Sequence, residues 1–160
     1  LALKKLEEKF DVLIITQNID DLHERAGSSH ILHLHGEIMY ARSSQNPALL
    51  YKLDKQSIDM GETCELGSQL RPHVVWFGEP VHMITKAMHE MPLADIVILI
   101  GSSMAVYPAA GLIDLIRSEI PVFVVDPKIP DVRIKNPVTK FEDKAVNAVP
   151  LLVKEILSSY

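Results

Sequence analysis

Three runs of branched apolar residues constrain the fold of this chain more than any other feature. They occupy residues 12–15, 96–100 and 122–125, and each is long enough for a strand but short for a buried helix. Runs that are apolar at every position are typical of parallel strands covered on both faces. Helical patterns over residues 81–91 and 109–118 lie before and after the second run. This alternation predicts strands connected by crossover helices.

Apolar spacing also predicts a short amphipathic helix over residues 1–10 and a final helix over residues 145–158. Strands that alternate with helices indicate an α/β protein with a Rossmann-like open parallel sheet, in which ligands bind at the carboxyl ends of the strands. The middle of the chain holds turn residues and no long apolar run, which indicates a small inserted module. We therefore assign residues 1–36 and 71–160 to one Rossmann-like domain and residues 37–70 to the module.

Composition narrows the classes of partner and the cellular setting. The chain has 160 residues and a net charge of −5, which disfavours non-specific nucleic-acid binding. No run approaches the ~18 apolar residues that a membrane span needs. A single cysteine, Cys64, excludes an internal disulfide framework and fits a reducing compartment. We expect a cytoplasmic protein without nucleic-acid or membrane partners.

Polar side chains follow the first predicted strand directly. Gln17, Asn18 and Asp20 lie at its carboxyl end, where amides and a carboxylate can hold sugar hydroxyls and a carboxamide. The alternative is helix capping, with Asn18 or Asp20 as the N-cap of a short helix that ends at Gly27. Spacing alone leaves both interpretations open.

Two histidines alternate with leucines over residues 30–36. In a strand, Leu32 and Leu34 would face the core, and His33 and His35 would share the other face. A histidine on a rigid strand can act as a base near neutral pH. A metal pair and a purely structural role are the alternatives, and the metal pair lacks a third ligand nearby in the sequence.

Two further segments carry weaker signals. Residues 71–79 are largely apolar and end in Gly-Glu, so their aromatic side chains could wall a channel and their backbone could pair with a peptide. A core strand explains the same composition. Gly101, Ser102 and Ser103 follow the second strand and would let a backbone approach a nucleotide, although they do not form a GxGxxG motif.

Together these segments resemble the sirtuin family, in the bacterial class that also includes the mitochondrial desuccinylase. The resemblance covers nearly the whole chain except residues 37–70. It rests on four motifs in the family's order and spacing: Gln17-Asn18-Ile19-Asp20, His35-Gly36, Phe77-Gly78-Glu79 and Gly101-Ser102-Ser103.

The resemblance implies an NAD-dependent protein-lysine deacylase. The acyl oxygen of a modified lysine would attack the ribose of NAD and release nicotinamide. His35 would act as general base on a ribose hydroxyl, and the products would be free lysine and O-acyl-ADP-ribose. The nicotinamide riboside would lie against Gln17, Asn18 and Asp20.

The resemblance also implies residues for the other ligand groups. Those expected to contact the adenosine half of NAD are Gly101, Ser102, Ser103, Asp126 and Ala145, with Asp126 at a position where the family usually has asparagine. Those expected to contact the acylated-lysine substrate are Val75, Trp76, Phe77, Gly78 and Glu79.

The chain departs from the family in its small module, where sirtuins carry four zinc-binding cysteines. Ser43 stands where related chains have cysteine, only Cys64 remains, and residues 37–70 contain no histidine. Hydroxyls are poor zinc ligands, so we predict no metal. We expect apolar contacts to hold the module instead, made by Leu49, Leu50, Leu53, Ile58, Leu66 and Leu70.

The family's glycine-rich phosphate loop has no counterpart in residues 1–10. We therefore expect an N-terminal part upstream, and an unpaired sheet edge that this part or a second copy of the chain would cover. A non-catalytic NAD- or peptide-binding fragment is the alternative function. A metal-dependent hydrolase built on His33 and His35 is a third.

Overall fold

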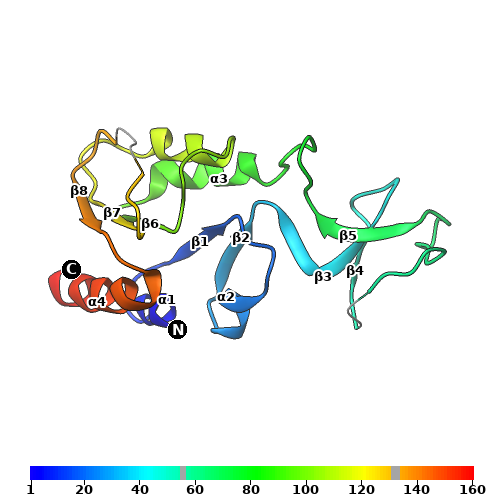
Figure 1. Cartoon of the computed structure of the whole chain (residues 1–160), viewed down its shortest axis with the longest axis horizontal. Helices are drawn as coiled ribbons and strands as arrows, with labels where there is room; N and C mark the ends of the chain where they lie inside the picture. The colour runs from blue at the N-terminus through cyan, green and yellow to red at the C-terminus, as the bar shows by residue number, and fades with distance from the viewer. Residues whose placement is uncertain (55–56, 131–133) are drawn as a thin grey trace.

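The computed structural model describes residues 1–54, 57–130 and 134–160. A layered α/β body lies at one end, and a small antiparallel module lies at the other (Figure 1). The body contains a parallel sheet in the order β6-β7-β8, formed by Val97–Ile100, Val122–Val125 and Val138–Phe141. A second parallel pair joins β1 (Leu13–Thr16) to β2 (His30–His33).

Helices cover both faces of these strands. On one side lie α3 (Ile84–Glu90) and two 3₁₀ helices, η1 (Met91–Leu93) and η2 (Ala109–Leu115). On the other side α1 (Ala2–Leu6) packs against α4 (Ala145–Ser159) (Figure 1). This arrangement explains why β7 is buried along its whole length.

The two parallel sheets belong to one layer, although no ladder joins them within the described residues. The core beside α3 and η2 contains Leu32 from β2 and Val124 from β7. The core beside α4 likewise takes Val12 from the start of the first strand segment and Phe123 from β7. The predicted α/β, Rossmann-like class is therefore confirmed, but the sheet is divided. Within the described chain, β1 and β6 each have one strand neighbour and one unpaired edge.

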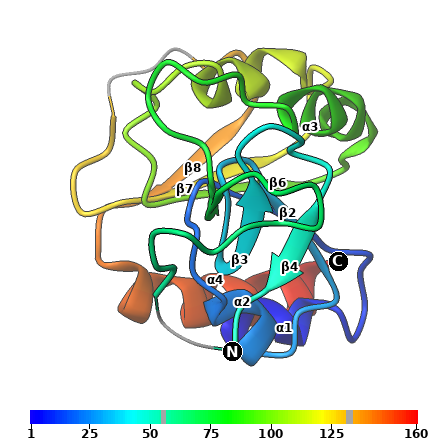
Figure 2. The same ribbon diagram turned by 90° about the vertical axis from the view of Figure 1, so that its right-hand side faces the viewer.

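The module is a three-stranded antiparallel sheet in the order β4-β3-β5, which Figure 2 turns toward the viewer. Its strands are β3 (Gly36–Ser43), β4 (Leu50–Lys52) and β5 (Leu70–Val74). The register between β3 and β5 shifts between Glu37 and Ala41, as at a β-bulge.

The expectation that apolar contacts hold the module is wrong. None of the six apolar residues expected to form its core is buried, and Leu50 and Leu66 are 47% and 69% exposed. Polar residues are buried instead. Ser43 Oγ lies 2.8 Å from Ser68 Oγ, and Cys64 Sγ lies 3.0 Å from Ser68 Oγ. Hydrogen bonds with Ser43 and Ser68 lower the pKa of the Cys64 thiol to about 7.

Three other elements differ from expectation. The predicted helix over residues 109–118 is the 3₁₀ helix η2, and the first helix ends at Leu6. Strand β8 was not predicted, because its run Val-Thr-Lys-Phe is short and half polar.

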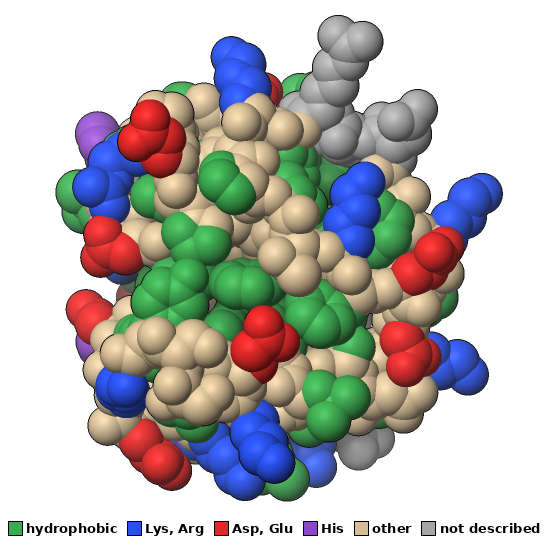
Figure 3. Space-filling model, turned by 90° about the vertical axis from the view of Figure 1, so that its left-hand side faces the viewer, with side chains coloured by type: hydrophobic (Ala, Val, Ile, Leu, Met, Phe, Trp, Pro, Cys, Tyr) green, Lys and Arg blue, Asp and Glu red, His purple; other side chains and the backbone are tan. Residues whose placement is uncertain are grey.

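The surface carries charges of both signs. On the face shown in Figure 3, hydrophobic side chains gather in a central area among interspersed acidic and basic groups. Within the described residues, no helix has the length and apolar character needed to cross a membrane.

Candidate functional site

The loop after β1 is held by four consecutive backbone carbonyls. The Thr16 carbonyl accepts from Leu34 N at 2.9 Å, and the Ile19 carbonyl accepts from Ile38 N at 2.8 Å. Between them, two imidazole rings take the place of backbone donors. The Gln17 carbonyl lies 3.1 Å from Nδ1 of His35, and the Asn18 carbonyl lies 3.0 Å from Nδ1 of His33. The chain from β2 into β3 therefore fixes four consecutive carbonyls, from Thr16 to Ile19.

Two side chains of this loop, those of Gln17 and Asn18, are available to bind a ligand. Within the described residues, neither the Gln17 nor the Asn18 side-chain amide has a hydrogen-bond partner. Asp20 behaves differently, because its carboxylate accepts from the backbone N–H of Leu22 at 3.1 Å, at the start of α2 (Leu22–Arg25). The N-cap of α2 is Asp21, which makes no side-chain cap bond in the described chain, so neither Asn18 nor Asp20 is the N-cap and the Asp20 contact is a turn before the helix. The side chains of Gln17 and Asn18 remain available as donors and acceptors.

His35 is poised as a base by its tautomer. A carbonyl oxygen accepts hydrogen bonds, so the contact with Gln17 requires a proton on Nδ1. The neutral ring then carries its lone pair on Nε2, which has no partner within the described part of the chain. The ring is partly exposed, so a ligand can reach this nitrogen.

The glycine beside His35 is required by the backbone. Gly36 has a φ of +80°, and a Cβ at this position would collide with the backbone carbonyl oxygen of His73. The absence of a side chain lets β3 leave the site close against β5. The His-Gly pair therefore combines a base with a close backbone approach.

His33 occupies a different environment from His35. It is 8% exposed, and its Nε2 lies 2.8 Å from Oε1 of Glu24. Burial alone would lower the pKa of His33, but hydrogen bonds with Glu24 and the Asn18 carbonyl outweigh it and raise the pKa above its ordinary value. This geometry supports the structural role left open for His33.

Among the described residues, one cluster of side chains could hold a metal ion. This cluster is not the His33–His35 pair that the sequence suggested. Ligand atoms of Glu24, His33 and Glu37 lie within 4.8 Å of one another. The His33 ring is already satisfied at both nitrogens by Asn18 and Glu24. An ion pair between the buried His33 and the exposed Glu24 accounts for this cluster without a cation.

The segment after β5 is tied to the histidine site. Val75 N donates to the carbonyl of His35 at 2.9 Å, which places the two segments side by side. The next two residues, Trp76 and Phe77, are 57% and 100% exposed. Large exposed aromatics beside a polar site are suited to contact a peptide.

Glu79 lies inside this segment, and its carboxylate accepts several hydrogen bonds. Its carboxylate accepts from Arg42 Nη2 at 3.1 Å, from Arg71 Nη1 at 2.5 Å and from Trp76 N at 3.0 Å. Hydrogen bonds from Arg71 and Trp76 lower the pKa of Glu79 to about 2. Both arginines also donate to the Val74 carbonyl. Glu79 therefore shapes the segment, and sequence reasoning did not identify the two arginines that hold it.

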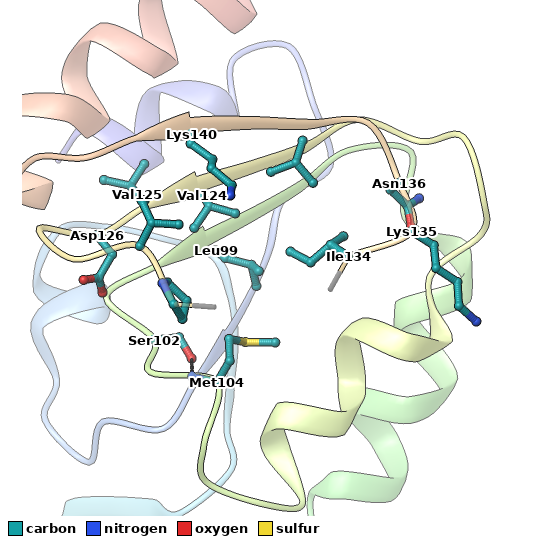
Figure 4. Close-up of a pocket in the computed structure, with 13 residues that line it drawn as sticks. Leu99, Ser102, Met104, Val124, Val125, Asp126, Ile134, Lys135, Asn136 and Lys140 are labelled. Carbon is teal, nitrogen blue, oxygen red and sulfur yellow. Dashed lines mark hydrogen bonds between the residues drawn. The ribbon is translucent and has the colours of Figure 1, made fainter. Parts of the chain in front are cut away.

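A pocket of about 460 Å³ lies at the carboxyl ends of β6 and β7 (Figure 4). Leu99, Met104 and Ile134 line its apolar part, while Ser102 and Asp126 lie where the strands end. Asp126 accepts from Lys128 N at 2.8 Å, which shapes the turn after β7. A mainly apolar pocket with a few polar groups is typical of small-molecule sites.

The residues expected around adenosine do not all line this pocket. Ser102 and Asp126 line the pocket, whereas Gly101, Ser103 and Ala145 do not. Ala145 packs instead in the core beside α4. The pocket also takes residues that the sequence did not indicate, namely Ile134, Lys135, Asn136, Val138 and Lys140. Recognising β8 as a strand would have placed several of them here.

Comparisons with known proteins agree on one family. Residues 1–108 match the model of the Sir2 family. An NAD-dependent protein deacylase of Helicobacter pylori is 42% identical over 156 residues, covering 98% of this chain and 68% of that protein.

Solved structures show the same likeness. A Sir2 homologue in complex with NAD superposes with a TM-score of 0.83 at 32% identity, covering 99% of this chain and 63% of that one. A Sir2 complex with a p53 peptide and NAD⁺ gives a TM-score of 0.72 at 26% identity, covering 98% and 67%. The chain thus spans about two thirds of the length of these relatives. On the family match, the shared sequence and the shared fold, it belongs to the Sir2 family.

Proposed function

We propose that this chain carries the catalytic histidine of an NAD-dependent protein-lysine deacylase. One observation carries the proposal: His35 is held through Nδ1 by the Gln17 carbonyl, and among the residues that the structure describes its Nε2 has no partner beside the loop of Gln17 and Asn18. A neutral imidazole with a free nitrogen can accept a proton from a hydroxyl group. Relatives of the chain that bear the name NAD-dependent protein deacylase support this assignment.

The residues present fit NAD at two places. The unpartnered amides of Gln17 and Asn18 can hydrogen-bond a carboxamide and sugar hydroxyls at the nicotinamide end. The pocket with Ser102 and Asp126 offers apolar walls for a base and a carboxylate for ribose hydroxyls. When bound, NAD supplies an electrophilic ribose carbon and nicotinamide as the leaving group.

The chain's own residues then divide the work. His35 Nε2 takes the proton of a ribose hydroxyl, while the Gln17 carbonyl holds the ring in the required tautomer. Val75, Trp76, Phe77 and Gly78 form the edge against which an acylated lysine peptide lies, and Glu79 keeps that edge in place. The exposure of Trp76 and Phe77 supports their role in peptide contact.

Two features of the setting also belong to the proposal. The single, buried Cys64 suits a reducing cytoplasm. The unpaired edges of β1 and β6 within the described residues suit pairing with another strand, from a longer form of the chain or from a second copy.

Nicotinamide release tests the proposal in the protein that carries these 160 residues. We expect release that requires both NAD and an acyl-lysine peptide, and that falls by ~10²–10⁴-fold in His35→Ala. His30→Ala is the matched control, because His30 is an exposed histidine of β2, the strand that precedes His35, and its ring lies at the surface beside Asp11. Peptide binding without nicotinamide release would favour a non-catalytic binding protein instead.

A further inference from the structure

His33 and His35 lie two residues apart on one chain segment, yet their partners differ. Both rings direct Nδ1 to consecutive loop carbonyls, those of Asn18 and Gln17. Over residues 1–54, 57–130 and 134–160, only the Nε2 of His33 has a second partner, the carboxylate of Glu24 at 2.8 Å. One histidine is therefore held at both nitrogens, and the other at one.

The two contacts of His33 fix its protons. The Asn18 carbonyl can only accept, so Nδ1 must carry a proton. The Glu24 carboxylate, when ionised, also accepts, so Nε2 must carry the second proton. With Glu24 ionised, both contacts of His33 are satisfied only by an imidazolium paired to the carboxylate.

The location of this ion pair links three elements. The imidazole comes from β2, the carboxylate from α2, and the carbonyl from the loop that joins β1 to α2. Asn18 N also donates to Thr16 Oγ1 at 3.0 Å, so the residue is held at both ends of its backbone. Fixing this backbone fixes the direction in which the Gln17 and Asn18 side chains leave the loop.

We propose that His33 and Glu24 are positioning residues, an imidazolium–carboxylate pair that orients Gln17 and Asn18 for the nicotinamide end of NAD. The proposal deepens the proposed function and rests on it for its kinetic readout. It gives the two histidines separate roles, with His33 held at both nitrogens as a positioning group and His35 held at Nδ1 as the base.

The charges around His33 agree with this assignment. Glu37 on β3 also faces the ring and favours its charged form, and His23 on α2 faces Glu24. Burial would raise the pKa of Glu24, but the hydrogen bond with His33 lowers it below its ordinary value. A folded-state pKa of His33 above 6.5 means that the pair is fully formed below that pH. It is lost as the pH rises through the raised value.

NMR of histidine ring nitrogens tests the protonation states without any NAD, with signals assigned by single His→Gln variants. We expect His33 to titrate above 6.5 and to carry protons on both nitrogens below that titration. The Gln17 carbonyl should keep a proton on Nδ1 of His35. A His33 that titrates at or below 6.5, or a His33 ring nitrogen that binds added Zn²⁺, would overturn the proposal.

Two substitutions at Glu24 test positioning through kinetics. In Glu24→Leu the Nε2 proton loses its acceptor, and we expect the KM for NAD to rise about tenfold, the equivalent of ~1.4 kcal/mol. In Glu24→Gln the amide can donate to a neutral Nε2 and so keep the proton on Nδ1. We therefore expect the KM for NAD to stay within about twofold.

The peptide KM and a surface control separate positioning from general damage. The KM for peptide should change less than about twofold in both variants, and Glu8→Leu, at an exposed glutamate of the N-terminal segment, should change neither constant. A purely structural defect would lower kcat through a smaller active fraction and leave KM for NAD unchanged, which would refute the proposal. If the proposed function itself is wrong, the result differs from a positioning effect and from a structural defect. In that case neither the variants nor the unmodified protein would release nicotinamide.

Discussion

Replacing Ser43 by alanine tests whether a buried serine–cysteine cluster holds the small module. Ser43 is 1% exposed, and its Oγ lies 2.8 Å from Ser68 Oγ and 3.5 Å from Cys64 Sγ. The same oxygen accepts from the backbone N–H groups of Gln45 at 3.3 Å and Asn46 at 3.1 Å. One hydroxyl therefore joins β3, the following turn and the segment that carries Cys64 and Ser68.

The expected cost follows from these contacts. A typical hydrogen bond contributes ~0.5–1.5 kcal/mol net, and a buried group left without a partner costs ~1–3 kcal/mol. The turn N–H groups lie near the surface and can bond to water, so the loss centres on Ser68 and Cys64. We expect the free energy of unfolding to fall by about 2 kcal/mol, which corresponds to a decrease in Tm of ~4–8 °C for a protein of this size.

Thermal and chemical denaturation measure this change, and Ser44→Ala is the matched control. Ser44 is the exposed neighbour of Ser43, so its hydroxyl should contribute little. A chelator should leave the Tm of the unmodified protein unchanged. The reasoning fails if Ser43→Ala is as stable as Ser44→Ala, or if the purified protein holds stoichiometric zinc.

Three further predictions concern the backbone, the ion-pair network and pH. Gly36→Ala should lower the free energy of unfolding by more than ~2 kcal/mol, because it adds a collision with His73 to the strain of a positive φ. Gly67→Ala, at a φ of +77° with no neighbouring atom, should cost only the strain; equal losses would refute this. Arg42→Met should raise the KM for acyl-lysine peptide about tenfold and leave the KM for NAD unchanged, because Arg42 holds Val74 and Glu79. The exposed Arg117→Met is the control. An unchanged peptide KM in Arg42→Met would contradict the role of Arg42 in holding the peptide edge. Because the pKa of Cys64 is about 7 in the folded chain and 9.0 as a free group, the unfolded chain binds more protons between these values. The free energy of unfolding should therefore rise from pH 7 to pH 9, and a Cys64→Ser variant that shows the same rise would exclude this cause.

Strands β1, β6 and β7 of the body could be predicted from sequence because each consists mainly of consecutive branched apolar residues. Residues 122–125 are β7 without any shift, and the alternation of Leu32 and Leu34 with His33 and His35 places the leucines in the core. Strand β8 escaped because it is an edge strand with two polar residues. Its pairing with β7, and not its composition, makes it a strand.

The contacts that define the site could not be derived from spacing. Glu24 and His33 are nine residues apart, and Arg42 and Glu79 are 37 apart, so tertiary structure alone brings them together. The module shows the same limit. Its leucines suggested an apolar core, but they are half-buried or exposed, and Ser43, Cys64 and Ser68 are buried instead.

A structure of the protein with NAD and an acyl-lysine peptide tests the central claim most directly. The measurement is the distance from His35 Nε2 to the nearest ribose hydroxyl, with Nδ1 still bonded to the Gln17 carbonyl. We predict a distance of about 2.6–3.2 Å, within hydrogen-bond reach of the proton to be removed. A ribose hydroxyl that instead faces another side chain, with His35 Nε2 turned away from NAD, would contradict the assignment of His35 as the base.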